Sequence, residues 1–181
     1  GELALAALQH GFESYGVDIL RRFYDLAVKP RRAVAWYAPD GTPARDEYSA
    51  PHDVVGASAM LRALVEGVCG VRDEGCAFGK ITLSPGWPAT GQTSAEVEIS
   101  YAPQPAYVSY RWALDGGRMT LDGDCKARGV KFQILLPRGN TPERVALGGR
   151  THEYSLVTIE KSKYVVLETE KKRGTVAVTL K

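Results

Sequence analysis

The residues best suited to chemistry lie in the connection 33–53, where aromatic, acidic and histidine side chains occur close together. Aromatic faces stack on sugar rings, and carboxylates and imidazoles bond to sugar hydroxyls. Hydrolysis of a glycosidic bond needs two carboxyl groups, one as acid and the other as base or nucleophile. Glu47 and Asp53 are the candidate catalytic pair. The candidate substrate-binding residues are Trp36, Tyr37, Tyr48 and His52.

A structural interpretation of the same connection remains open beside the functional one. Asp53 directly precedes an apolar helical run and can serve as its N-cap, with His52 packed at the helix start. Trp36 and Tyr37 can be ordinary core or interface aromatics. For each residue taken singly the structural role is the commoner one, whereas a connection of this length inside a compact domain is usually functional or mobile.

Other kinds of site have little support in the sequence. His10, His52 and His152 are far apart, so we expect no metal site. The chain contains no phosphate-binding glycine motif and no GxSxG, so we expect neither a cofactor nor a serine nucleophile at a strand–helix turn. Arg62 and Glu66 are four residues apart on a predicted helix, which is typical of a structural ion pair.

The cysteines bear on the cellular compartment. Cys69, Cys76 and Cys125 are odd in number and lack CxxC spacing. That pattern argues against a disulfide framework and against a cysteine-rich zinc site. It favours a reducing compartment, so we expect a cytoplasmic protein.

The charge balance gives no support to two classes of partner. Among 181 residues, 23 basic and 21 acidic side chains leave a formal net charge of +2. So small a charge gives no reason to expect a nucleic acid or an anionic membrane as partner. No apolar run reaches about 18 residues, so we expect no transmembrane helix.

The apolar pattern changes near residue 75. Before it, segments 2–9, 17–28 and 54–70 have helical spacing, and two glycines predict a turn over residues 10–16. After it, short alternating segments bounded by glycine, proline and aspartate predict strands. The expected strands are 81–83, 95–101, 106–112, 118–121, 130–136, 144–147, 154–160, 164–168 and 175–180.

These elements predict an α+β fold with two domains. A helical segment covers residues 1–74, and an antiparallel β-sandwich covers residues 75–181. Helix 54–70 is apolar nearly all round, and a helix of that kind is normally buried in a larger body. The other predicted helices are too few to cover it, so we expect further helices upstream and regard the chain as a fragment.

Several stretches resemble the six-hairpin glycosidases. Residues 49–57 (SAPHDVVGA), continuing through 64–71 (LVEGVCGV), resemble the last helix of their (α/α)6 barrel. Residues 81–89 (ITLSPGWPA) resemble the strand that follows it. Residues 132–137 (FQILLP) and 145–148 (VALG) resemble a strand pair of the C-terminal β-sandwich. α-L-Rhamnosidases and the cellobiose-phosphorylase group share this layout, and the resemblance covers about residues 10–150.

The resemblance implies the last hairpin of an α/α barrel followed by its supporting sandwich, with the long connection at the substrate end. The partners would be a glycoside or oligosaccharide and the upstream barrel helices of the same protein. In such families the principal acid generally lies earlier in the barrel, so no family catalytic residue maps onto Glu47 or Asp53. Pro51-His52-Asp53 stands where rhamnosidases have an asparagine-histidine-tyrosine type of sequence, which leaves the substrate open.

Three functions follow as alternatives. The first is the C-terminal part of a glycoside hydrolase, inactive by itself. The second is a non-catalytic carbohydrate-binding module that uses Trp87, Trp112 or Tyr107 of the sandwich. The third is a protein-interaction module whose apolar helix docks on a partner.

Overall fold

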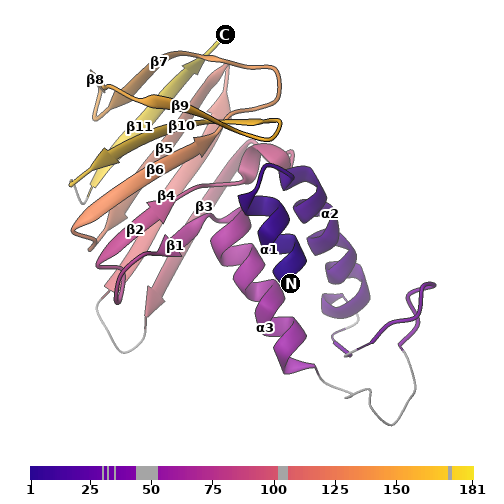
Figure 1. Cartoon of the computed structure of the whole chain (residues 1–181). Coiled ribbons are helices and arrows are strands. Elements are labelled where there is room, and N and C mark those ends of the chain that lie inside the picture. Colours follow the sequence, from indigo (N-terminus) through magenta and orange to yellow (C-terminus); the bar gives the residue numbers. More distant parts are fainter. Residues whose placement is uncertain (30, 32, 35, 44–52, 102–105, 171–172) are drawn as a thin grey trace.

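The structure is a computed structural model that describes residues 1–29, 31, 33–34, 36–43, 53–101, 106–170 and 173–181. Helices come first and two β-sheets follow, which confirms the predicted α+β class (Figure 1). No helix in the described ranges is long and apolar enough to cross a membrane. The helices are α1 (Glu2–Gln9), α2 (Glu13–Phe23) and α3 (Val54–Arg62), with π-helical continuations η1 (Tyr24–Val28) and η2 (Ala63–Val68).

The predicted start of the second helix was wrong. α2 begins at Glu13, and Gly16 lies inside the helix rather than in a turn. A Cβ on Gly16 would be 2.6 Å from Leu8 Cγ, and a Cβ on Gly67 of η2 would be 2.5 Å from Leu8 Cδ1. These glycines therefore let the helices approach closely around Leu8. They do not break the helices in which they lie.

The first sheet is mixed. Its strand order is β1-β2-β6-β10-β9, and the β2–β6 pair is parallel while the other pairs are antiparallel. The parallel pair arises because the chain leaves this sheet after β2, builds three strands of the other sheet, and returns as β6. Its strands are β1 (Val71–Asp73), β2 (Lys80–Leu83), β6 (Gly129–Leu135), β9 (Ser155–Ile159) and β10 (Ser162–Thr169).

The second sheet is antiparallel throughout, in the order β3-β4-β5-β11-β7-β8. Gly116 and Gly117 make the β4–β5 turn, and both have positive φ (52° and 76°), a conformation that glycine adopts without steric cost. Its strands are β3 (Ser94–Tyr101), β4 (Ala106–Asp115), β5 (Arg118–Cys125), β7 (Pro142–Leu147), β8 (Arg150–Thr151) and β11 (Arg173–Leu180).

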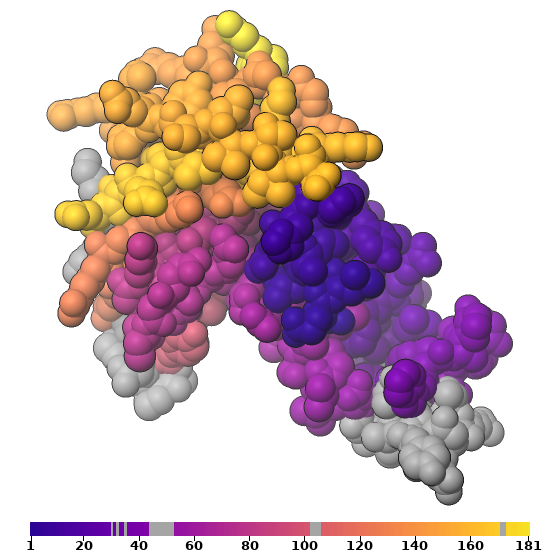
Figure 2. All heavy atoms as spheres, in the orientation of Figure 1, coloured from indigo at the N-terminus to yellow at the C-terminus, as the bar shows by residue number. Residues whose placement is uncertain are grey.

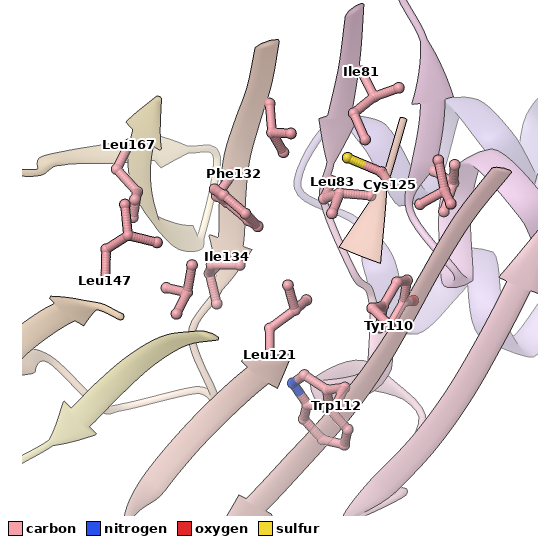
Figure 3. Packing of buried hydrophobic residues seen from close by; sticks show 14 of the residues in the cluster. Ile81, Leu83, Tyr110, Trp112, Leu121, Cys125, Phe132, Ile134, Leu147 and Leu167 are labelled. Carbon is pink, nitrogen blue, oxygen red and sulfur yellow. The ribbon is translucent and has the colours of Figure 1, made fainter. Parts of the chain in front are cut away.

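The main hydrophobic core lies between the two sheets (Figure 3). Alternate residues of each strand point inward, as in β4, where Val108, Tyr110 and Trp112 are buried. Across from them, Ile81 of β2 and Phe132 of β6 come from the first sheet. The molecule is therefore a β-sandwich with a helical layer attached at one end (Figures 1 and 2).

The helical layer and the sandwich meet around residue 70. β1 pairs with β2, so the first sheet already begins at Val71. Immediately before it, the Gly86 N–H donates to the Val68 carbonyl at 2.9 Å. The division of the chain into domains at residues 74 and 75 stays a prediction.

Candidate functional site

The structure describes half of the six predicted site residues. Glu47, Tyr48 and His52 lie outside the described residues. Trp36, Tyr37 and Asp53 are described.

The two aromatic residues of the connection differ in their surroundings. The Trp36 side chain is 63% exposed, so it is not the core aromatic that the structural interpretation allowed. Tyr37 is partly buried; its hydroxyl accepts from Val34 N–H at 3.2 Å and donates to the Leu26 carbonyl at 3.4 Å. Tyr37 thus ties the connection to the end of η1, whereas Trp36 presents its ring to solvent.

Asp53 lies at the N-cap position of α3, as the structural interpretation expects, but its side chain makes no capping hydrogen bond. Its backbone N–H donates to the Ala33 carbonyl at 3.1 Å, which joins the two ends of the connection. Asp53, at the start of α3, therefore lies at the end of the helices that points away from the sandwich (Figure 1). Nothing in the described ranges tests whether Glu47 and Asp53 face one another.

Trp112 does not belong to a sugar-stacking surface. Its side chain is 2% exposed, in the centre of the sandwich core. Trp87 packs against the same core and donates from Nε1 to the Tyr110 hydroxyl at 2.9 Å. Tyr107 lies under the Lys126 ammonium, 5.8 Å from the ring centroid. The tryptophan platform considered for a carbohydrate-binding module is therefore not formed.

A buried carboxylate links the helices to the sandwich. Glu13, in the first turn of α2, is only 6% exposed and accepts hydrogen bonds from Ser162 Oγ at 2.6 Å and from the Tyr164 hydroxyl. Burial, and secondarily the bond to Glu13, raise the pKa of Tyr164. Glu13 and Ser162 line a cleft of about 390 Å³ between α2 and the β9–β10 turn. Glu13 could not be singled out from the sequence, because its partners lie about 150 residues away.

A second cleft, of about 600 Å³, opens where η2 meets β1 and β3. Its lining includes Arg62 and Glu66 from the helices and Arg72, Asp73 and Tyr101 from the sandwich. Arg62 and Glu66 form the expected ion pair, with Nε and Oε1 2.9 Å apart. The other three were not identified from the sequence, because only the packing of the two sheets brings β1 and β3 together.

The metal-ligating and nucleophilic residue types form no cluster in the described part of the chain. No group of three or more histidine, cysteine or acidic side chains there could hold a metal ion. Cys69, Cys76 and Cys125 form no disulfide with one another. Burial raises the pKa of the Cys69 thiol to about 11, so this cysteine is protonated and unreactive at neutral pH.

The helices carry a large exposed apolar surface. α3 has no buried residue, and its Val54 and Val55 are 75% and 78% exposed. α1 and α2 continue the pattern with Leu3 and Tyr15. We call this set the apolar helix face; its members are Leu3, Phe12, Tyr15, Tyr24, Val28, Val54, Val55, Leu61 and Leu64. Large apolar side chains exposed in this number on the helices indicate a binding or packing surface.

The chain was compared with known proteins. Its sequence matches no protein-family model and no curated protein. Its structure is similar to that of an α-L-rhamnosidase from Dictyoglumus thermophilum, with a TM-score of 0.51 and 15% identity over 67% of this chain. The chain spans only 14% of the length of that enzyme.

A second solved structure is a cycloalternan-forming enzyme from Listeria monocytogenes in complex with a pentasaccharide substrate. The match has a TM-score of 0.39 and 12% identity, and covers 55% of this chain and 10% of that one. A TM-score that low does not establish a shared fold. The rhamnosidase match supports a glycosidase-related fold, and at 15% identity it speaks to the fold alone.

Proposed function

We propose that this chain is the C-terminal part of a carbohydrate-active enzyme, a glycoside hydrolase, in which it supplies the last helices of an α/α barrel and the sandwich that supports them. The observation that carries the proposal is the apolar helix face, above all α3, which buries none of its residues within this chain. The fold shared with part of an α-L-rhamnosidase supplies the kind of larger protein to which such helices belong.

The proposed occupant of the apolar helix face is a set of earlier helices of the same polypeptide. A helix that is apolar nearly all round is stable only when other helices cover it. In this arrangement the helices as far as η2 belong to the barrel, and the two sheets, which begin with β1 at Val71, form the accessory sandwich. The rhamnosidase is about seven times as long as the matched part, since the chain spans 14% of it, which leaves ample length for such helices in a protein of that kind.

The connection 33–53 would then supply substrate contacts at the far end of the barrel helices. Exposed Trp36 is suited to stack on a sugar ring, and Tyr37 anchors the connection to η1. Tyr48 and His52 are the further proposed contacts, and Glu47 and Asp53 the proposed carboxyl groups. Because the principal acid in the resembling families lies earlier in the chain, we propose that these 181 residues do not hydrolyse glycosides alone.

The test compares two proteins with the same assay. The product of the natural gene and the 181-residue chain are each incubated with a panel of nitrophenyl glycosides that includes the α-L-rhamnoside. We expect hydrolysis by the natural product and none by the 181-residue chain. Hydrolysis by the 181-residue chain, or none by a longer natural product on any glycoside, contradicts the proposal.

A protein-interaction module is the second candidate, because the apolar helix face would serve equally for docking on a separate chain. It predicts a natural product of 19.7 kDa that is isolated with a specific protein partner and has no affinity for sugars. For the alternative of a carbohydrate-binding module, burial of Trp112 removes one of its three candidate aromatic residues, and Trp87 and Tyr107 remain.

A further inference from the structure

The cleft between η2 and the sandwich has the size of a small-molecule site. Its volume of about 600 Å³ lies within the range of ligand pockets, about 300–1,000 Å³. Helical residues form one wall, and β1, the turn after it and β3 form the other. The cleft borders η2 and β1, at the sandwich end of the helices. α3 begins at Val54, next to Asp53, at the opposite end (Figure 1). The cleft is thus separate from Asp53, the described member of the candidate catalytic pair.

An aromatic pair forms part of the cleft lining. Phe78 and Tyr101 are stacked, with ring centroids 4.5 Å apart and an interplanar angle of 25°. Phe78 is buried, whereas Tyr101 is 43% exposed. Phe78 therefore holds the Tyr101 ring from behind, and an exposed ring fixed in this way is suited to stack against the apolar face of a ligand.

Asp73 fixes the same wall by hydrogen bonds. Its Oδ2 accepts from Phe78 N–H at 3.1 Å and from the Tyr101 hydroxyl at 3.3 Å, and its Oδ1 accepts from Gly75 N–H at 3.1 Å. Burial and the nearby Asp73 carboxylate raise the pKa of Tyr101, which keeps the phenol protonated as a donor. The tyrosine ring and the carboxylate are thus placed before any ligand arrives.

The helical wall offers a matching pair of charged groups. Arg62 donates to Glu66 Oε1 from Nε at 2.9 Å, and its second contact, from a terminal nitrogen to Oε2, is 3.5 Å. Glu66 is the more buried of the two side chains. This pair leaves guanidinium N–H groups and carboxylate lone pairs that can bond to a ligand.

The Arg72 side chain has a buried donor, Nε, without a hydrogen-bond acceptor in the described part of the chain. The nearest acid is Glu74, whose Oε1 is 3.9 Å from Nε, too far for a hydrogen bond. A buried donor without a partner is costly, and because this Nε has almost no exposed surface, a ligand oxygen in the cleft would satisfy it only after the Arg72 side chain shifts.

The charged and hydrogen-bonding groups of the lining indicate which class of ligand fits the cleft. Two arginines face three acids, so a strongly charged ligand of either sign would meet repulsion from part of the lining. A neutral molecule rich in hydroxyls can accept from the arginines, donate to the carboxylates and lay one apolar face on Tyr101. We propose that this cleft, lined by Arg62, Glu66, Arg72, Asp73 and Tyr101, is a binding site for a neutral saccharide. The proposal stands on the cleft alone and does not depend on the hydrolase function.

The experiment measures binding by the 181-residue chain. The chain is first applied to an array of neutral glycans, and the saccharide with the strongest signal is then titrated by calorimetry. Tyr101→Ala should weaken its affinity at least about tenfold through loss of the stacking surface, and Glu66→Gln, which keeps the side-chain shape, about threefold to tenfold. The matched controls are Tyr154→Ala, at a tyrosine of similar exposure (39%), and Glu98→Gln, at an exposed acid of β3.

Each outcome decides the proposal. Loss of affinity in both cleft variants with unchanged affinity in both controls supports it. If no neutral glycan binds, if binding is unaffected by Tyr101→Ala and Glu66→Gln, or if only charged glycans bind, it is overturned. Unchanged thermal unfolding of Glu66→Gln shows that a loss of affinity is not a loss of folding. Because this readout is binding and not hydrolysis, its failure is distinguishable from failure of the proposed function.

Discussion

The sandwich and the helical layer differ in how far they bury their apolar side chains. In the sandwich, strands from two sheets close on one continuous core. In the helical layer, the buried residues form two small clusters around Leu5 and Leu8, while the apolar helix face stays open. The difference teaches that the sheets cover most of their apolar side chains within this chain, with Leu156 and Val157 of the edge strand β9 exposed, whereas the helices leave many of theirs uncovered.

The difference follows from the sequence pattern of each part. In a strand, alternation sends one set of side chains inward and the other outward, so a single partner sheet is enough to cover the apolar set. In α3 the apolar residues surround the helix, so α1 covers only part of it. One neighbour is sufficient for a two-sided strand, and several are needed for such a helix.

The largest expected effect separates the two parts directly. Trp112→Ala removes a fully buried indole from the sandwich core and should cost about 3–5 kcal/mol of unfolding free energy. Val55→Ala, at a residue 78% exposed on α3, should change it by no more than about 0.5 kcal/mol. Urea unfolding followed by far-ultraviolet circular dichroism measures both. A cost at Val55 close to that at Trp112 would show that the apolar helix face is already covered in this chain.

The next largest effect concerns the hydrogen bonds by which Glu13 joins the helical layer to the sandwich. Glu13→Ala leaves Ser162 and Tyr164 without their shared acceptor and should cost about 2 kcal/mol. Glu13→Gln keeps one carbonyl acceptor and should cost less. Glu143→Ala, at an exposed acid of β7, is the control and should be nearly neutral. Equal unfolding free energies for Glu13→Ala and Glu143→Ala would show that Glu13 does not hold the helices to the sandwich.

The smallest expected effect is a loss of folding stability that appears only at alkaline pH. Burial is the main cause that raises the pKa of both Tyr110 and Tyr164, whereas an unfolded tyrosine titrates near pH 10 (about its ordinary value). A raised pKa means that the folded state resists losing the proton, so stability is full below about pH 10 and falls as the pH rises further. Unfolding free energies measured on both sides of about pH 10 should fall less steeply for Tyr164→Phe than for the unmutated chain. Identical slopes would contradict the role given to burial of this phenol.

Much of the sandwich could be predicted, because alternation and turn residues are local signals. All nine predicted strands correspond to strands of the structure, and the Gly116-Gly117 turn lies where expected. β1 and β8 were missed, since strands of three and two residues are too short to show alternation. The start of α2 was wrong because Gly16 is used for close packing, and only the tertiary structure reveals its contact with Leu8.

The functional residues were less predictable. The composition of the connection 33–53 was visible in the sequence, and the structure confirms exposure of Trp36 but does not test the role of any residue there. The cleft between η2 and the sandwich could not be predicted from the sequence. Asp73 and Tyr101 are 28 residues apart, and they meet because β1 and β3 border the same end of the sandwich. No spacing rule connects two residues that strands from different sheets bring together.

The central claim is that the apolar helix face is covered by earlier helices of the same polypeptide. The measurement that tests it most directly is the intact mass of the protein produced from the natural gene. The account predicts a mass well above the 19.7 kDa of this chain, with further helices preceding Gly1. A mature product of 19.7 kDa would contradict it, and the apolar helix face would then have to be covered by a separate partner.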